Sequence, residues 1–322
     1  MKKLYFITNL QSGKNAMRGK LAAVIDRFTA AGYEVTVRTT QARMDACAAA
    51  EYACLSNRFD LIVCSGGDGT LNETVQGLMH SGQPLPLGYI PCGSTNDFAK
   101  SLRFPTEIED AAQWLLSGKR YQCDVGVFNS RNFLYIAAFG AFTSASYDTP
   151  QNMKNFMGHF AYLLRGLALV PSIRPLRVKI EYDGKVIEDE FIYGMVSNTA
   201  AVAGMLKLRS FQLDDGKFEV MLIRKPANVI DLQHIISQLM NLDEDVDPEY
   251  VQYFRASDLR FISNEEIPWT VDGEYGGTTC DAEISVCRRA VTFCVGADAP
   301  ENDEALPALP PDEAGVEQEK EV

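Results

Sequence analysis

A glycine-rich turn between an apolar strand and a helix is the feature that most constrains the fold of this chain. The turn, Gly66–Thr70 (GGDGT), follows the apolar run Leu61–Cys64 and precedes Leu71–Met79, where apolar residues recur at helical spacing. Glycines let the backbone approach a phosphate closely, and a helix N-terminus offers unpaired N–H groups. Asp68 repels a bare phosphate, but a divalent cation between the two anions removes that conflict. The unit therefore indicates Mg-dependent phosphoryl transfer rather than dinucleotide oxidoreduction.

The alternation of strand and helix extends through the first 120 residues. The predicted strands are Lys3–Thr8, Glu34–Arg38, Leu61–Cys64 and Leu87–Ile90, and the predicted helices are Lys20–Ala31, Asp45–Leu55 and Leu71–Met79. This order predicts a doubly wound, parallel-sheet nucleotide-binding domain with helices on both faces. Ligands in such domains lie beyond the carboxyl ends of the strands. A turn at Ser12-Gly13-Lys14 follows the first strand, so we expect it to share one crevice with the GGDGT turn.

The second part of the chain is dominated by strand-like runs. They are Asp124–Phe128, Phe133–Phe139, Leu176–Tyr182, Val186–Ser197, Phe218–Ile223, Leu259–Ile262, Ile284–Val286 and Val291–Val295. Asp183-Gly184 is a hairpin signal, and helices are expected at Met153–Leu169 and Val229–Leu242. We predict an α/β domain at 1–122, a β-sandwich-like domain at 123–297 whose end can pack back on the first, and a tail at 298–322. The helix at Met153–Leu169 fits a core position and a membrane-facing position equally well.

The distribution of charge separates the tail from the body of the protein. The net charge is −13, of which residues 299–322 carry −7 and residues 1–298 carry −6. The tail also holds four prolines and no aromatic residue, a composition typical of a disordered, solubilising segment. A body with this ordinary charge shows no nucleic-acid footprint.

The eight cysteines form no CxxC pair, and neither they nor the three histidines have the spacing of zinc ligands. The N-terminus enters a strand directly and has no signal-peptide pattern, so we expect a reducing cytoplasm in which most thiols are small core residues. Apolar runs fall short of the about 18 residues needed to span a bilayer. We therefore expect a soluble or peripheral protein.

A second acid-bearing turn follows the fourth predicted strand. It contains Gly93, Ser94, Asn96 and Asp97 and precedes a helical pattern. Asn96 and Asp97 alone fit an ordinary helix N-cap. Two acid-bearing glycine turns at neighbouring strand ends favour a joint nucleotide and metal site instead.

The motifs together resemble a known family. GGDGTLNE is shared in outline by NAD kinases, phosphofructokinases and lipid kinases, but its combination with Ile90–Ala99 (IPCGSTNDFA) resembles the soluble diacylglycerol kinase catalytic family. Further matches are Asn9–Gly13, Leu213–Phe218 and Val271–Tyr275, and Tyr147–Pro175 is most similar to the bacterial diacylglycerol kinases of lipid recycling. The resemblance covers residues 1 to 297. Leu10 stands where the family usually has proline, and Ser94 where it usually has threonine; neither change removes a donor that phosphate needs.

The resemblance implies roles for individual residues. ATP would be bound by Asn9, Ser12, Gly13, Lys14, Thr40, Gly66, Gly67, Asp68, Gly69, Thr70, Leu71, Asn72 and Ser94. A structural Mg²⁺ would be held by the carbonyls of Gln212 and Lys217 and the carboxylate of Asp215. Glu274 would accept the proton of the lipid hydroxyl, Asp68 and Asp97 would organise the metal through water, and Asp124 would assist. From the residues alone, Asp214–Gly216 fits a plain β-turn and Asp272-Gly273 a hairpin.

The function implied is the Mg²⁺- and ATP-dependent phosphorylation of diacylglycerol to phosphatidate, for recycling of phospholipid and lipoteichoic acid lipids. A carboxylate base in a lipid-lined cleft fits this chemistry, since phosphoryl transfer needs positioning and charge neutralisation. The enzyme would bind the membrane surface reversibly and form a homodimer. The alternatives are a kinase of another lipid alcohol (a sphingoid base or ceramide), an NAD kinase, and a silent nucleotide-binding regulator.

Overall fold

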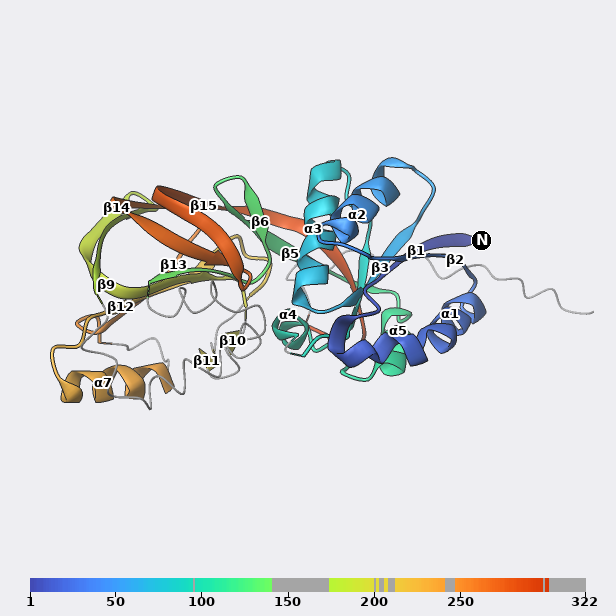
Figure 1. Cartoon of the computed structure of the whole chain (residues 1–322), viewed down its shortest axis with the longest axis horizontal. Helices are drawn as coiled ribbons and strands as arrows, with labels where there is room; N and C mark the ends of the chain where they lie inside the picture. Colours follow the sequence, from blue (N-terminus) through green and yellow to red (C-terminus); the bar gives the residue numbers. More distant parts are fainter. Residues whose placement is uncertain are drawn as a thin grey trace, which may run out of the picture.

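Two lobes make up the part of the chain that is described by the computed structural model, an α/β lobe that holds the N-terminus and a β lobe (Figure 1). The described residues are 1–94, 96–140, 174–199, 201–202, 206–207, 212–240, 247–297 and 299–300. The helix expected at Met153–Leu169 and nearly all of the acidic tail lie outside them.

The α/β lobe is built on four parallel strands. They are β1 (Lys2–Thr8), β2 (Tyr33–Thr39), β3 (Leu61–Gly66) and β4 (Leu87–Pro91), in the order β2-β1-β3-β4. Every residue of β3 and β4 is buried, as expected for central strands that are covered on both faces. The four strands predicted for this lobe are therefore confirmed.

Helices cover both faces of this sheet. The helices α2 (Asp45–Leu55) and α3 (Asp68–Ser81) pack together on one face, and α1 (Leu21–Ala30) and α5 (Ile108–Leu115) lie on the other (Figure 1). The sequence prediction missed α5, whose buried residues do recur at helical spacing over its short length. It also missed the 3₁₀ segment η1 (Ser12–Gly19), whereas the helical pattern expected after the Asn96-Asp97 turn is the short helix α4 (Asp97–Ser101).

The start of α3 differs from the prediction. The helix begins at Asp68 rather than Leu71, so Gly69 and Thr70 belong to its first turn. Gly67 is the N-cap in an extended conformation, and the backbone N–H of Leu71 donates to its carbonyl at 3.1 Å. The glycine turn is thus tighter than the apolar periodicity indicated, and it leaves Asp68 in the first turn of the helix.

The described part of the β lobe contains more strands than predicted. They are β5 (Lys119–Phe128), β6 (Arg131–Phe133), β7 (Ile136–Gly140), β8 (Leu176–Tyr182), β9 (Lys185–Ser197), β10 (Ala201–Val202), β11 (Leu206–Lys207), β12 (Phe218–Arg224), β13 (Val251–Ala256), β14 (Leu259–Val271) and β15 (Glu274–Val295), and the helix α7 (Val229–Met240) lies among them. The hairpin expected at Asp183-Gly184 is confirmed, because Tyr182 pairs with Lys185 and both turn residues have positive φ.

A single long strand joins the lobes. The runs Ile284–Val286 and Val291–Val295 are not separate strands but parts of β15, which has a register shift between Cys287 and Val291. β15 pairs with β5 and β14, and its residue Phe293 pairs in parallel with Leu87 of β4. Hydrogen-bonded strands therefore run from one lobe into the other.

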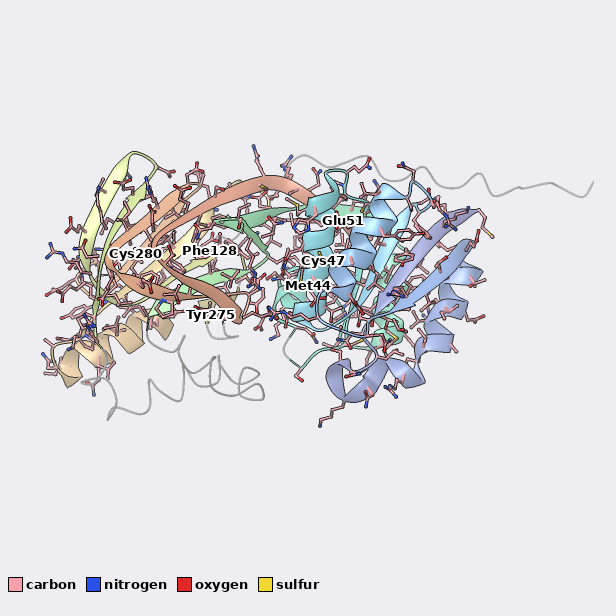
Figure 2. All side chains as sticks on the ribbon, turned by 45° about the horizontal axis from the view of Figure 1, so that its top comes forward. Met44, Cys47, Glu51, Phe128, Tyr275 and Cys280 are labelled. Carbon is pink, nitrogen blue, oxygen red and sulfur yellow. The ribbon has the colours of Figure 1, made fainter. Side chains whose placement is uncertain are left out.

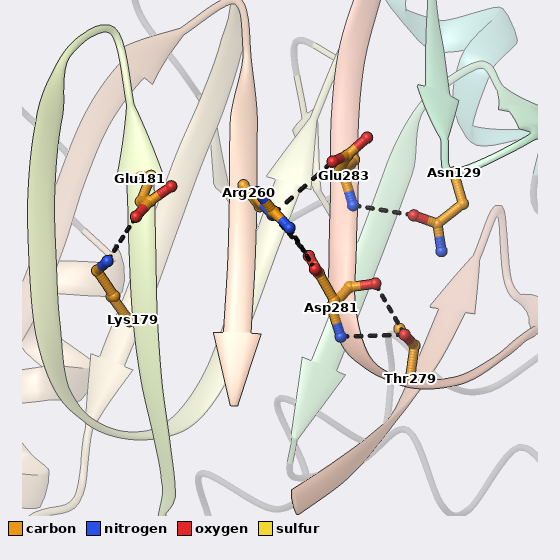
Figure 3. A network of polar contacts seen from close by, with 7 residues as sticks. All are labelled: Asn129, Lys179, Glu181, Arg260, Thr279, Asp281 and Glu283. Atoms are coloured by element: carbon orange, nitrogen blue, oxygen red, sulfur yellow. Dashed lines mark hydrogen bonds and ion pairs between the residues drawn. The ribbon is translucent and has the colours of Figure 1, made fainter. Parts of the chain in front are cut away.

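Aromatic residues fill the core of the β lobe. Trp269 is buried, and its ring centroid lies 5.0 Å from that of Phe128, 4.9 Å from Phe139 and 5.1 Å from Phe261. The outer surface of the same lobe carries exposed ion pairs across β14 and β15, centred on the bidentate contact of Arg260 with Asp281 (Figure 3). The lobe has an ordinary apolar interior and a solvated exterior.

Candidate active site

Three turns meet at the carboxyl ends of the parallel strands. The first follows β1 at Ser12–Asn15, the second follows β3 at Gly66–Gly69, and the third follows β4 at Cys92–Asn96. Gly13, Lys14 and Asn15 all have positive φ, so the first turn folds back tightly on itself. Thr95 of the third turn lies outside the described residues.

The turns approach each other so closely that side chains cannot fit between them. A Cβ atom on Gly13 would lie 1.6 Å from the carbonyl oxygen of Cys92, and one on Gly93 would lie 2.6 Å from the Cα of Gly67. The backbone N–H of Cys92 donates to the carbonyl of Gly66 at 2.7 Å. The turns at Ser12–Asn15 and Gly66–Gly69, which were expected to share a crevice, are therefore brought together by the third turn, which contacts both.

Side-chain amides hold the turns in place. Asn9 Nδ2 donates to Thr70 Oγ1 at 3.3 Å, which ties the end of β1 to α3. Asn96 Oδ1 accepts from the backbone N–H of Gly93 at 2.9 Å, and its Nδ2 donates back to the Gly93 carbonyl at 2.9 Å. The buried Tyr89 hydroxyl donates to the carbonyl of Gly66 at 3.1 Å. The amide of Asn96 thus shapes its own turn instead of only capping a helix.

Asp68 has an unusual electrostatic environment. Its Oδ1 is buried and, among the described residues, has no hydrogen-bond partner. Its pKa is raised to about 6, chiefly by burial and also by the nearby carboxylate of Asp97, while backbone N–H groups of Asn96 and Phe98 oppose the shift. A buried carboxylate oxygen with a second carboxylate beside it and no donor is suited to a cation.

Asp97 is the partner that the sequence predicted. It opens α4, its side chain is buried, and its Oδ1 accepts from Lys100 Nζ at 2.7 Å. Lys100 is half-exposed, so water competes for the ammonium group. The structure brings Asp68 and Asp97 into one site from two different strand–helix connections.

Asp272 is a functional candidate that the sequence reading treated only as a hairpin residue. Its carboxylate accepts the backbone N–H groups of Leu134 at 2.7 Å and of Tyr135 and Ile136 at 3.0 Å. It also accepts a hydrogen bond from Asn72 of α3. The bond from Asn72 joins the two lobes, and the three backbone bonds lie where the strand predicted at Phe133–Phe139 is interrupted between β6 and β7. The sequence signal for Asp272 was the motif Asp272-Gly273-Glu274, which lies in the run Val271–Tyr275 that carries the family resemblance.

Tyr135 lies where carboxylates from both lobes come near each other. Burial raises the pKa of its hydroxyl well above the usual range, and the next contributors are the negative charges of Asp272, Asp68, Asp97 and Glu274. A Cβ atom on Gly273 would lie 3.3 Å from the Tyr135 hydroxyl. Residues from both lobes therefore meet around this ring.

Glu274 lines a pocket at the junction of the lobes. Its Oε2 accepts from Arg43 Nη2 at 2.8 Å and from Arg131 Nη2 at 3.0 Å. The pocket encloses about 300 Å³ and is lined by Arg43, Met44, Gly69, Asn72, Glu73, Gln76, Arg131, Asp272 and Glu274. Met44 near the start of α2 and Tyr275 at the start of β15 mark the two sides of this junction in Figure 2.

A larger pocket lies on the other side of the glycine turns. It encloses about 500 Å³ and contains Gly13, Gly93 and Ser94. The remaining predicted nucleotide residues lie near the strand ends: the backbone N–H of Thr40 donates to Thr8, and Lys14 is exposed. Leu71 contributes only its backbone, because its side chain is in the hydrophobic core.

The predicted structural metal residues form a separate cluster before β12. Gln212 and Lys217 are exposed. Asp215 Oδ2 is paired with Arg255, and its Oδ1 accepts the backbone N–H of Lys217 at 3.0 Å. Asp124 is buried nearby and accepts the backbone N–H groups of Gly216 and Arg289, both at 2.6 Å. Within the described ranges, no group of three or more His, Cys, Asp or Glu side chains is arranged to hold a metal.

Glycine turns that converge on buried carboxylates, in an α/β lobe followed by a β lobe, define a phosphate-handling enzyme. Comparison with known proteins gives the family. The model of the diacylglycerol kinase catalytic domain matches residues 3–128, and that of the YegS C-terminal NAD kinase beta sandwich-like domain matches 139–294. The chain belongs to the diacylglycerol kinase family.

Relatives from two genera cover most of the chain. A diacylglycerol kinase of Bacillus subtilis is 38% identical over 279 residues, which is 86% of this chain and 91% of the relative. One from Staphylococcus carnosus is 36% identical and covers 86% and 90%. A crystal structure from Bacillus anthracis has a TM-score of 0.80 at 25% identity and covers 93% and 98% of the two chains. In the part of the chain that could be searched, no helix is long and apolar enough to span a membrane.

Proposed function

We propose that this protein is an ATP-dependent lipid kinase that transfers the terminal phosphate of ATP to the free hydroxyl of diacylglycerol, giving phosphatidate. The observation that carries the proposal is the unpartnered, buried Oδ1 of Asp68 beside Asp97, at the point where the glycine turns meet. A kinase needs positioned backbone donors for the phosphates and a cation to neutralise charge. The names of the relatives support diacylglycerol as the acceptor.

ATP would lie along the doubly wound lobe with its phosphates on the glycine turns. Gly13, Gly67 and Gly93 are the positions where the backbones come closest. The backbone N–H groups of Gly69 and Thr70, which precede the first intrahelical bond of α3, are available for phosphate oxygens. Asn9, Ser12, Lys14, Thr40, Asn72 and Ser94 complete the proposed ATP-binding set.

Asp68 and Asp97 fit a magnesium site, since one carboxylate oxygen lacks a donor and the second acid has only a half-exposed lysine. Bound there, Mg²⁺ would neutralise charge on the transferred phosphate. Both oxygens of Asp215 already accept protein donors. A metal at Asp215 would have to share or displace these donors, so the site at Gln212, Asp215 and Lys217 stays a prediction, and we propose no reaction step through it.

Glu274 is the proposed proton acceptor for the lipid hydroxyl. It is half-buried in the junction pocket beside Asn72 and Asp272, on the side of α3 that carries the nucleotide turn. Arg131 and Arg43 hold its carboxylate in the pocket through ion pairs at 3.0 and 2.8 Å. Asp272 would fix the backbone on which Glu274 stands.

We propose that lipid enters between the α/β lobe (1–122) and the β lobe (123–297), that the enzyme is cytoplasmic and binds the membrane surface reversibly, and that it acts as a homodimer in lipid recycling.

The decisive experiment combines purified protein, Mg-ATP and dispersed diacylglycerol, with phosphatidate as the measured product. We expect product from the wild type and a loss of activity of at least ~10²-fold in Asp68→Ala and Glu274→Ala. Parallel reactions with a sphingoid base, ceramide and NAD test the other acceptors. ATP binding without turnover on any acceptor would contradict the proposal and favour a silent regulator.

A further inference from the structure

The guanidinium of Arg43 comes from the nucleotide lobe and contacts a carboxylate of the β lobe. Arg43 lies in the loop between β2 and α2, at the carboxyl edge of the sheet where the glycine turns also lie. Its Nη2 is 2.8 Å from Glu274 Oε2, although the two residues are 231 positions apart. The same pocket is lined by Gly69 and Asn72 of the strand–turn–helix unit. Arg43 therefore stands between the proposed base and the proposed phosphate site.

The two arginines on Glu274 are held very differently. Arg131 is 25% exposed, and its Nη1 also donates to the carbonyl of Tyr275 at 3.0 Å, so it has a second anchor on the same hairpin. Arg43 is 71% exposed, and Glu274 is its ion-pair partner. An exposed, singly anchored arginine exchanges partners at low cost because water already solvates most of its guanidinium.

The other acids of the pocket have hydrogen-bond donors of their own. Asp272 is satisfied by backbone N–H groups and Asn72, and Glu73 accepts from the backbone N–H of Ala46 at 3.3 Å. Neither acid needs Arg43. A triphosphate that arrives on the first turn of α3 brings several anionic oxygens, which a guanidinium binds in a bidentate manner.

We propose that Arg43 is a nucleotide-phosphate ligand that leaves Glu274 when ATP binds, while Arg131 remains as the residue that positions Glu274. The inference rests on the proposed function, since it assumes that ATP binds at the glycine turns and that Glu274 is the base. Moving the guanidinium of Arg43 to the phosphate leaves the carboxylate of Glu274 held by Arg131, which is itself anchored on the carbonyl of Tyr275, at the moment the nucleotide is in place.

The first test measures nucleotide binding without lipid. Equilibrium dialysis with Mg-ATP and with adenosine would compare the wild type with Arg43→Ala and Arg43→Lys. We expect Arg43→Ala to weaken ATP binding ~10-fold or more, since it removes a charge-assisted hydrogen bond, and to leave adenosine binding unchanged. Arg43→Lys should restore part of the ATP affinity because it keeps the charge but not the bidentate geometry.

Arg177 provides a matched control. Arg177 is 70% exposed and pairs with Glu188 at 2.9 Å, whereas Arg43 is 71% exposed and pairs with Glu274 at 2.8 Å. Arg177 lies on β8. Arg177→Ala should change neither ATP binding nor turnover.

The second test separates the two arginines by steady-state kinetics with Mg-ATP and diacylglycerol. Arg43→Ala should raise the KM for ATP, whereas Arg131→Ala should lower kcat ~10-fold or more with the KM for ATP unchanged, and Arg131→Lys should recover part of kcat. Equal ATP affinity in the wild type and Arg43→Ala would overturn the inference, and so would an Arg43→Ala variant with raised kcat and unchanged ATP affinity. A wild type that binds no ATP would instead refute the proposed function.

Discussion

Carboxylates at the junction of the lobes and carboxylates on the outer face of the β lobe have opposite environments. At the junction, burial raises the pKa of Asp68 and of Asp272 to about 6. On the outer face, Arg260 lowers the pKa of Asp281 and Lys179 lowers that of Glu181 (Figure 3). The same chemical groups thus serve two purposes. Paired, exposed acids solvate a surface, whereas buried acids short of cations form a site that a cation and a phosphate can complete.

The largest effect is expected where the turns touch. Gly13→Ala places a Cβ in contact with the carbonyl of Cys92 at a positive φ. Backbone strain and overpacking together should cost about 2–5 kcal/mol of the free energy of unfolding, measured with urea. Gly118 also has a positive φ but no neighbour within 4 Å, so Gly118→Ala isolates the strain and should cost about 1 kcal/mol. Equal losses in both variants would show that the close approach of the turns does not matter.

The next effect concerns the carboxylate that ties the lobes together. Asp272→Asn replaces one acceptor oxygen by an amide donor that faces backbone N–H groups of residues 134–136. Leaving buried donors without acceptors should cost about 2–4 kcal/mol. Chemical denaturation at pH 7 measures this loss. A variant as stable as the wild type would show that the hydrogen bonds accepted by Asp272 do not stabilise the fold.

A smaller effect should appear in how the free energy of unfolding of the wild type and of Asp272→Asn depends on pH. Because burial raises the pKa of Asp272 from 3.8 to about 6, its contribution to stability is fully present below pH 3.8 and is lost as the pH rises through about 6. Asp272→Asn lacks this contribution. The stability difference between wild type and variant should therefore grow by about 1 kcal/mol between pH 7 and pH 5. A difference that shrinks over this interval would mean that Asp272 stays ionised through its backbone donors.

The smallest effect belongs to the outer face. Asp281→Asn breaks the exposed pair with Arg260, in which both side chains are about half-exposed. Such pairs contribute about 0.2–1 kcal/mol, and less at high salt. Urea unfolding at low and high salt should show a small, salt-sensitive loss and unchanged kinase activity. A loss as large as that of Asp272→Asn would erase the distinction between the two regions.

Local patterns were sufficient to predict the elements that position the nucleotide turns. The GGDGT turn, the Asn96-Asp97 turn and the strands that precede them follow from apolar runs, glycines and capping residues within short windows. The hairpin at Asp183-Gly184 and most of α7 were predicted for the same reason. The helix α5 was missed although its apolar residues have helical spacing, because it is only eight residues long.

What the sequence determined by itself is a set of units: strand–turn–helix connections that present acids and glycines, and a run of strands that follows them. The tertiary structure alone decided that Asp272 accepts three backbone N–H groups and Asn72, that β15 is one strand joining both lobes, and that Arg43 contacts Glu274. The reason is physical. Turns and helices depend on neighbours a few residues away, whereas these contacts join residues 136 or more positions apart. Only the packed chain brings such groups within hydrogen-bonding distance.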